Sequence, residues 1–430
     1  MDHIRLFVET NIRYVRQTST VIWEMKASEF LFFPENFLWG ACLSDYQHFG
    51  GSICDLRLRW TAKHYTLYRE DFELIPKLKL KAFRTGIEWA RIEPKEGVVD
   101  REAVKFYHDY FKALRKTGVK TFVTLHHFTN PAWVHDHGGW LSEKVVEKFV
   151  EYVDFVSSEF GEYIDYYVVI NEPAMYALNS YMSGEAGFPP HHSDMNEVLS
   201  CIHNLVGALS RCYEVIHEND EKTSVGFSHF IPTIVPENPS DPDNVQMCKT
   251  AEDALLYLVP DSLKDRIDYM GVDYYVNIYL SKEGSIVKSE INPEGLRHYL
   301  KKFYDKYRKP IAIIENGFPT RDEEMKIKFM LDHLKQVHDA VNEDKVDIFA
   351  YHWWSFLHGY EWGLGYSPFF ALIDVDIDKT YKRTVTKTAE VYTQICEQNG
   401  FSKKTYETYH KMHKQCLFKV KPPSPFAFQP

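Results

Sequence analysis

The sequence predicts an α/β protein built as a single (β/α)8 TIM barrel, and three observations support this prediction. Short apolar runs alternate with longer amphipathic stretches along most of the 430 residues, which is the pattern of repeated βα units around a parallel sheet. Eight such runs can be counted, and eight parallel strands close a barrel. No linker or low-complexity tract divides the chain, and barrels with insertions reach this length as one domain.

The expected strands are short and apolar, as strands covered on both faces should be. They fall at residues 37–43, 82–87, 121–126, 167–171, 225–229, 269–274, 311–315 and 348–353. Amphipathic stretches between them predict helices, for example over residues 100–116 and 144–160, with Gly118 and Gly161 placed to end them. A proline-rich stretch, residues 232–242, is expected to be a loop on the barrel.

The barrel is expected to occupy residues 31–415, with an extension before it and a tail after it. Residues 1–30 mix apolar and basic side chains with Asp2 and Glu9, which favours a packed or frayed helix, with an interfacial membrane helix as the alternative. Residues 416–430 are proline-rich and aperiodic. They are expected to pack on the surface as an extended segment, with disorder or a subunit contact as the alternatives.

Composition excludes several classes of protein. A formal net charge of -11 argues against nucleic acid as a partner, because phosphate binding depends on basic surface. No apolar run approaches the roughly 18 residues of a membrane span, and no secretory signal pattern opens the chain. The seven cysteines are scattered without a CxxC pair, so neither a zinc site nor a disulfide framework is indicated. We therefore expect a cytoplasmic protein with free thiols.

Two glutamates stand at the ends of predicted strands. Glu315 follows the apolar run in Pro-Ile-Ala-Ile-Ile-Glu-Asn-Gly at residues 310–317, and Glu172 follows that in Tyr-Tyr-Val-Val-Ile-Asn-Glu-Pro at residues 166–173. Catalytic side chains collect at the carboxyl ends of barrel strands, although a single strand-end glutamate can equally be a solvated side chain. The pair is more informative, because cleavage of a glycosidic bond needs two carboxyl groups that face it.

The sequences around these glutamates resemble a known family. Asn-Glu-Pro at residues 171–173 and Ile-Glu-Asn-Gly at residues 314–317 are similar to the acid/base and nucleophile motifs of the β-glycosidases of glycoside hydrolase family 1. Further stretches resemble the family in the same order, at residues 36–47, 83–84, 124–127, 268–275 and 354–362. The matches span nearly the whole chain, and the compact archaeal β-glycosidases are the most similar members.

The resemblance implies roles for particular residues. Glu315 would be the nucleophile and Glu172 the acid/base, and Arg84 and Tyr275 would support the nucleophile. A neighbouring arginine would also keep the Glu315 carboxyl ionised. The implied sugar-binding residues are Gln47, His127, Asn171, Glu361 and Trp362, with Trp354 beneath the sugar ring. The resemblance implies no cofactor and no metal, and no third ligand is spaced to complete a metal site with the histidines at residues 126–127.

The chain departs from the family pattern at three places. Asp273 stands where the family has Asn, and an ionised Asp only accepts hydrogen bonds and would add negative charge near Glu172 and Glu315. A role for Asp273 in core packing is the alternative. Residues 358–359 read His-Gly where the family usually has Asp-Asn, and residues 48–49 read His-Phe where it has Ile-Glu. The shape of the sugar-binding loop and of the aglycone entrance is therefore left open.

The predicted function is that of an exo-acting, retaining β-glycosidase whose substrate is a small-molecule or oligosaccharide β-glycoside. β-D-Glucose is the first expected glycone, with β-galactosides, β-mannosides and β-fucosides as alternatives, and the aglycone can be aryl, alkyl or a sugar. A homo-oligomer stays open. The alternative from another class is a catalytically inactive carbohydrate-binding barrel, because a fold does not determine a function.

Overall fold

The computed structural model describes residues 29–50, 61–184 and 187–412. The predicted extension lies outside these ranges except for its last two residues, and the predicted tail lies wholly outside them. Within the described ranges, no helix is long and apolar enough to cross a membrane. The five cysteines in these ranges are buried and carry free thiols.

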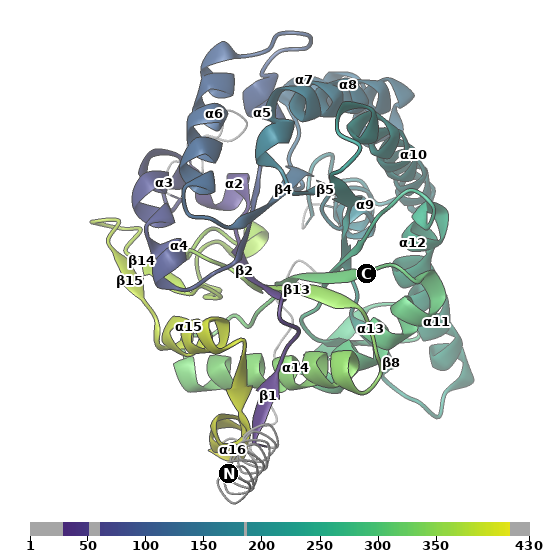
Figure 1. Ribbon diagram of the computed structural model, residues 1–430. Coiled ribbons are helices and arrows are strands. Elements are labelled where there is room, and N and C mark those ends of the chain that lie inside the picture. The colour runs from purple at the N-terminus through teal and green to yellow at the C-terminus, as the bar shows by residue number, and fades with distance from the viewer. Residues whose placement is uncertain (1–28, 51–60, 185–186, 413–430) are drawn as a thin grey trace, which may run out of the picture.

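A sheet of parallel strands forms the centre of the molecule, and Figure 1 shows the helices arranged around it. Its strands are hydrogen-bonded in the order β6-β5-β4-β3-β2-β13-β12-β9-β7. Their bounds are β2 (Leu38–Cys42), β3 (Ala82–Gly86), β4 (Lys120–His126), β5 (Tyr166–Ile170), β6 (Ser224–Gly226), β7 (Ser228–Phe230), β9 (Met270–Asp273), β12 (Ile311–Asn316) and β13 (Ile348–Trp354). The prediction of a single (β/α)8 barrel is confirmed.

The fifth predicted strand is interrupted, which the apolar pattern did not indicate. Its first half, β6, pairs with β5, and its second half, β7, pairs with β9 on the other side. The chain changes partner at Phe227, whose backbone oxygen accepts a hydrogen bond from Gly271 at 3.1 Å. This change of partner closes the barrel.

Amphipathic helices cover the outside of the sheet. The helix predicted over residues 100–116 is α6 (Arg101–Arg115), and its N-cap Asp100 accepts hydrogen bonds from two backbone N–H groups. The helix predicted over residues 144–160 is α8 (Glu143–Phe160). The others are α2 (Asp45–His48), α3 (His64–Phe72), α4 (Leu74–Lys77), α5 (Trp89–Ile92), α7 (Ala132–Asp136), α9 (Pro173–Tyr181), α10 (Met195–Asn219), α11 (Pro242–Glu252), α12 (Leu258–Leu263), α13 (Pro293–Tyr307), α14 (Glu323–Asn342), α15 (Lys387–Gln398) and α16 (Lys403–Met412).

A small second sheet stands beside the barrel. It consists of β8 (Thr233–Pro236), β10 (Asn277–Leu280) and β11 (Ile286–Glu290), in the order β11-β10-β8. The expectation that residues 232–242 form only a loop was therefore wrong in its first part. β8 is an edge strand, and an edge strand tolerates the proline at its end because no neighbour needs that missing N–H.

The barrel interior is filled by side chains. One layer combines the small residues Ala82, Ala312 and Ala350 with larger residues such as Phe122 and Tyr269. Because this layer closes the lower part of the barrel, space for a ligand is left at the carboxyl ends of the strands.

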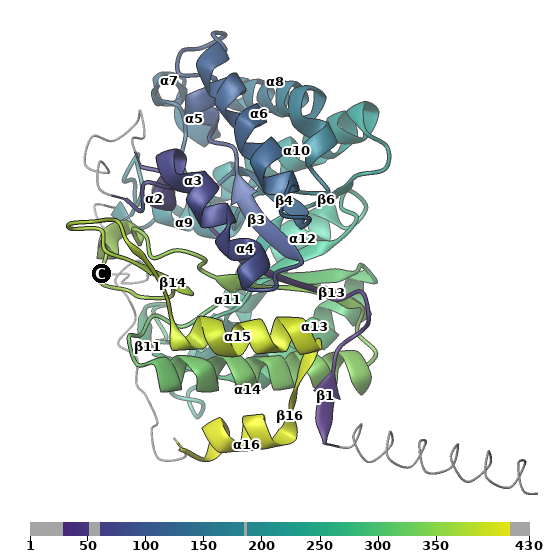
Figure 2. The same ribbon diagram turned by 60° about the vertical axis from the view of Figure 1, so that its left-hand side comes forward.

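The ends of the described chain meet away from that space. β1 (Phe30–Phe32) pairs antiparallel with β16 (Gly400–Ser402), and Figure 2 shows this pair beside α16. Figure 2 also shows α15 lying along α14. The β1–β16 pair therefore joins the two ends of the described barrel.

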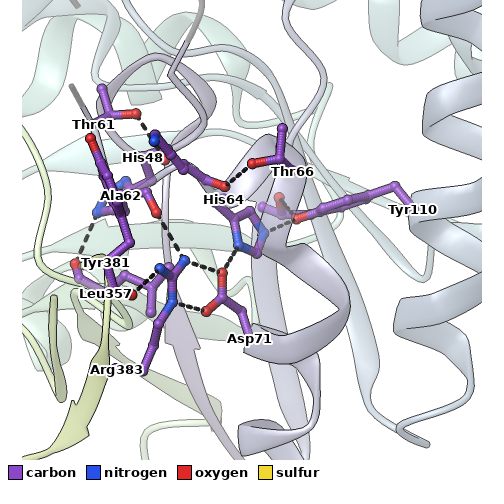
Figure 3. A network of polar contacts seen from close by, with 12 residues as sticks. His48, Thr61, Ala62, His64, Thr66, Asp71, Tyr110, Leu357, Tyr381 and Arg383 are labelled. Carbon is purple, nitrogen blue, oxygen red and sulfur yellow. Dashed lines mark hydrogen bonds and ion pairs between the residues drawn. The ribbon is translucent and has the colours of Figure 1, made fainter. Parts of the chain in front are cut away.

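A buried polar network ties the hairpin of β14 (Ile373–Val375) and β15 (Arg383–Val385) to α3 (Figure 3). Arg383 Nε donates to Asp71 at 2.6 Å, and His64 Nδ1 lies 2.7 Å from the same carboxylate. Burial alone would raise the pKa of Asp71, but its bonds to His64 and Arg383 lower it. The network anchors the chain that follows the predicted sugar-binding loop.

Candidate active site

A pocket of about 420 Å³ opens at the carboxyl ends of the barrel strands. The predicted site residues that line it are Gln47, His127, Asn171, Glu172, Tyr275, Glu315, Trp354, Glu361 and Trp362. Arg84 lies beneath them and contacts two of them. A larger hollow of about 660 Å³ lies at the opposite end of the barrel, where Tyr166 and Phe349 line it, but no predicted site residue reaches it.

Glu315 lies near the end of β12 and is held on both carboxylate oxygens. Arg84 donates to Oε1 at 2.5 Å, and the Tyr275 hydroxyl donates to Oε2 at 2.7 Å. Burial works against the Arg84 charge, but the neighbouring carboxylates of Glu315 and Asp273 outweigh it and raise the pKa of Arg84. The guanidinium stays charged, and a donor holds each of the two Glu315 carboxyl oxygens in place.

Glu172 lies between β5 and α9 in a different setting. Its backbone is left-handed, with φ of 40°, a conformation that costs a non-glycine residue about 1–3 kcal/mol. The backbone N–H donates to the Ser228 oxygen at 3.0 Å, which holds the residue in place. Burial first, and then the charges of Asp273 and Glu315, raise the pKa of Glu172 well above its ordinary value. This carboxyl therefore tends to keep its proton.

The two glutamates face each other closely. Carboxyl oxygens of Glu172, Asp273 and Glu315 all lie within 4.8 Å of one another. Retaining glycosidases place their two carboxyl groups about 5–5.5 Å apart, whereas inverting enzymes leave about 6.5–9.5 Å for a water molecule. The separation of Glu172 and Glu315 leaves no room for such a water and suits direct attack by a carboxylate.

Arg84 also orients Asn171, the residue before Glu172. Its NH2 group donates to the Asn171 side-chain oxygen at 2.5 Å, and its Nε donates to the Thr124 hydroxyl at 3.0 Å. Because the Asn171 oxygen faces the guanidinium, the amide NH2 group is the donor that this side chain offers to a ligand.

Gln47 and Glu361 form a hydrogen-bonded pair at another side of the pocket. Gln47 Nε2 donates to Glu361 Oε2 at 3.2 Å, and Gln47 Oε1 accepts from the Ser44 hydroxyl at 2.6 Å. Burial first, and then the charge of Glu315, raise the pKa of Glu361 to about 8. Gln47 Nε2 also donates to the Tyr360 oxygen at 2.9 Å, so both amide hydrogens are engaged and the pair offers acceptor oxygens to hydroxyl groups of a sugar.

Aromatic rings complete this side of the pocket. The His127 ring lies nearly parallel to the rings of Trp354 and Trp362, at 5.9 and 6.3 Å between centroids. Burial first, and then the Arg84 charge, lower the pKa of His127, so its imidazole is neutral and can donate or accept. The ring of Tyr46, a residue that the sequence did not single out, stacks on the Trp362 ring at 5.4 Å between centroids. Such surfaces bind the apolar faces of sugar rings.

Two of the departures from the family pattern lie in contact. His48 is buried, its Nε2 lies 3.1 Å from the Leu357 oxygen, and its ring meets the Trp354 ring edge-on at 5.7 Å. A Cβ atom on Gly359 would lie 2.6 Å from the His48 ring. The glycine at 359 therefore makes room for the histidine at 48, and the loop still carries Glu361 and Trp362 into the pocket.

The sequence did not predict the apolar wall of the pocket. Its members are Met175, Phe188, Phe230, Val276, Ile278, Ile286, Phe318, Leu364 and Phe370. Ile278 and Ile286 lie on the second sheet, and Val276 directly precedes its strand β10. The alternation of apolar residues at 276, 278 and 280 was the available sequence signal for this wall. Phe128 lies against Phe188 and Trp362, at 5.2 and 5.3 Å between ring centroids.

A pocket with two facing carboxyl groups at the carboxyl end of a (β/α)8 barrel has the design of a glycoside hydrolase active site. The family model described as Glycosyl hydrolase family 1 matches residues 31–263 and 279–401. The chain belongs to this family and is a glycoside hydrolase.

Similar proteins include enzymes with different substrates. Beta-glucosidase A of Thermotoga maritima is 27% identical, over 86% of this chain and 98% of the relative. A 6-phospho-beta-galactosidase of Staphylococcus epidermidis is 26% identical, over 85% of this chain and 98% of the relative. The structure of a beta-glycosidase from Pyrococcus horikoshii is 28% identical with a TM-score of 0.80, covering 89% of this chain and 98% of that chain.

Proposed function

We propose that this chain is a retaining exo-β-glycosidase that removes a terminal sugar by double displacement. The observation that carries the proposal is the approach of the Glu172 and Glu315 carboxyl oxygens to within 4.8 Å. The contrast between them supports the division of roles, since Arg84 and Tyr275 donate to the two oxygens of Glu315 while the surroundings of Glu172 favour its protonated form.

The proposed reaction has two steps. First, a Glu315 oxygen attacks the anomeric carbon while Glu172 gives its proton to the glycosidic oxygen, and the aglycone leaves as an alcohol. Esterified Glu315 no longer carries a charge, so one of the causes of the raised Glu172 pKa disappears. Glu172 then accepts a proton from water, the water oxygen attacks the anomeric carbon, and the ester bond to Glu315 breaks. The sugar leaves with its configuration retained.

We propose an unphosphorylated hexose, first β-D-glucose, as the glycone. Among the described residues that line the pocket, the charged groups are the carboxyls of Glu172, Glu315 and Glu361, and neither lysine nor arginine lines it. A phosphate with nearly two negative charges would be repelled there and would lack a partner. Of the alternative glycones, galactose differs from glucose in the hydroxyl group at C4, fucose at C4 and C6, and mannose at C2.

The apolar wall favours an aryl or alkyl aglycone over a second sugar. Val276, Ile278 and Ile286 offer it no hydrogen bonds, so a polar aglycone would lose its contacts with water without replacement. A cytoplasmic location and a homo-oligomeric state stay predictions from the sequence.

A panel of 4-nitrophenyl β-glycosides that differ in the glycone tests the proposal. The β-glucoside should be cleaved, and octyl β-glucoside should be a better substrate than cellobiose. Ile286→Asn should reduce this preference for the alkyl glucoside. The matched change Val287→Asn, at an exposed neighbour on the same strand, should not. If the folded protein turns over no glycoside of the panel, the inactive carbohydrate-binding barrel is correct instead.

A further inference from the structure

Asp273 lies between the two glutamates and has no role in the scheme above. It ends β9, it is fully buried, and its carboxyl lies within 4.8 Å of those of Glu172 and Glu315. The Ser228 hydroxyl, on the neighbouring strand β7, donates to Oδ2. Oδ1 takes no hydrogen bond from a fixed donor among the described residues. A protonated carboxyl next to it would supply a donor for this buried oxygen.

The charges around Asp273 do not balance without such a proton. Glu172 and Glu315 face it from β5 and β12, and the Arg84 guanidinium faces it from β3. Cys42 on β2 and the Tyr275 hydroxyl are neutral, because burial first and then nearby negative charge raise the pKa of each. Three carboxyl groups thus meet one guanidinium, which already bonds Glu315. Three carboxylates this close together cannot all be ionised beside one cation.

We propose that Asp273 is a positioning residue that keeps the acid proton on Glu172: its carboxylate, held by Ser228, accepts a hydrogen bond from the protonated Glu172 carboxyl. The inference rests on the proposed acid/base role of Glu172. Under this proposal, Asp273 supplies a negative charge at the position where the Asn of the family would supply a neutral hydrogen-bond donor. The segment between the two family matches, residues 264–278, contains this position.

The direction of the titration agrees with this arrangement. After burial, the charge of Asp273 is the largest cause of the raised Glu172 pKa, ahead of Glu315, and the Glu172–Asp273 hydrogen bond raises it further. Burial first, and then the charge of Glu315, raise the pKa of Asp273 as well, while the Arg84 charge and the hydrogen bonds from Ser228 and Glu172 act to lower it. The two groups titrate as a pair, and the proton is better placed on Glu172.

The arrangement affects the two half-reactions differently. Asp273 holds the proton in the free enzyme up to a higher pH, so the first half-reaction continues at alkaline pH. After Glu172 has given up its proton, two carboxylates are adjacent, and Glu172 becomes a stronger base toward water. The basic limb of kcat/KM should therefore lie at a higher pH than it would with Asn at 273.

Asp273→Asn tests the proposal, with kcat/KM measured against pH on one aryl β-glucoside. The Asn amide can donate to the Glu172 carboxylate and so stabilises the ionised acid. We expect the basic limb to move down by about 1 to 3 pH units, the effect of one charge at this range. The matched change Asp265→Asn, at an exposed position, should leave the limb in place. A limb that stays or moves up in the Asp273 variant would overturn the proposal.

A second measurement does not depend on activity. Carboxyl groups with raised pKa values bind more protons in the folded than in the unfolded state, so stability falls as pH rises from the ordinary to the raised pKa. Without the Asp273 carboxyl, the stability of the folded protein should decrease less as the pH rises. The Tm of Asp273→Asn relative to the native chain should therefore be higher at about pH 8 than at about pH 5. If the native chain cleaves no glycoside but this Tm pattern is found, the proposed function fails while the proton-sharing pair stands.

Two further outcomes are decisive. If Asp273→Asn does not fold, Ser228→Ala replaces it: the loss of the donor to Asp273 should lower kcat/KM without moving the basic limb down, and a downward shift would contradict the proposal. If Zn²⁺ or Mg²⁺ binds the native chain at micromolar concentrations and Asp273→Asn abolishes binding, a cation balances the three carboxylates and the proton-sharing arrangement is overturned.

Discussion

Glu315 and Glu172 end stretches of similar sequence, yet their surroundings are opposite. Arg84 and Tyr275 donate to the two oxygens of Glu315, whereas Glu172 faces the carboxyl of Asp273 from a left-handed backbone. Glu315 has a donor on each carboxyl oxygen, whereas the Glu172 carboxyl lies where its negative charge is unfavourable. The comparison teaches that the neighbours of each glutamate, and not the strand that carries it, assign attack to one and proton transfer to the other.

Removing Glu315 should have the largest effect. Glu315→Gln lacks a charged oxygen to attack the anomeric carbon, and kcat should fall on the order of 10⁴-fold or more, for every leaving group. Initial rates on 4-nitrophenyl and alkyl β-glucosides measure this loss, and circular dichroism checks the fold. Residual activity within tenfold of the native chain would contradict the contrast between the two glutamates.

Removing Glu172 should have a large effect that depends on the leaving group. An acid catalyst contributes about 10²–10⁴-fold, and its help matters most when the leaving alcohol is a poor one. Glu172→Gln should therefore lose far more activity on an alkyl glucoside than on a 2,4-dinitrophenyl glucoside. A plot of log kcat/KM against leaving-group pKa should become steeper, and equal losses on both substrates would exclude the proton-donor role.

Glu361 is the third carboxyl group that lines the pocket, and its removal should change the selectivity of the enzyme between sugars. A hydrogen bond to a charged group is worth about 1.5–3 kcal/mol, so above about pH 8, where Glu361 is ionised, Glu361→Gln should lower kcat/KM about tenfold to a hundredfold. The losses on β-glucosides and β-galactosides should differ, and an unchanged epimer ratio would place Glu361 outside the sugar subsite. Since its pKa is raised to about 8, the ligand-free variant should also lose less stability as pH rises from about 4.5 to 8.

The smallest effect on chemistry should come from Gly359. A methyl group at this position would meet the His48 ring and the Gln47 backbone oxygen, so Gly359→Ala should lower Tm and raise KM with little change in kcat. Gly359→Ala combined with His48→Ala should recover part of the lost Tm. Independent, additive effects of the two changes would show that these two positions are not coupled.

The sequence predicted the parts of the molecule that depend on local pattern. The apolar runs located the barrel strands, and two strand-end glutamates predicted a carboxyl pair across one pocket. Arg84 and Tyr275 came from family resemblance and lie against Glu315 as expected. Their catalytic roles stay predictions, because position alone does not measure function.

What the sequence did not predict depends on contacts between distant segments. The switch of partner at Phe227 follows from which neighbours the strand finds, and local apolar character does not encode that. The fit of His48 to Gly359 joins residues more than 300 positions apart in the chain, so each substitution looked like an isolated departure. The close approach of the Glu172 and Asp273 carboxyl groups likewise needs β5 and β9 to be placed in the closed barrel.

Covalent trapping tests the central claim most directly. A 2-deoxy-2-fluoro β-glucoside with a good leaving group slows breakdown of the glycosyl-enzyme more than its formation, so the intermediate accumulates. Mass spectrometry of a digest should place the sugar on Glu315, and NMR of the turnover of an ordinary substrate should show the β-anomer first. A label on Glu172 or Asp273, or release of the α-anomer, would contradict the roles derived from the surroundings of the two glutamates.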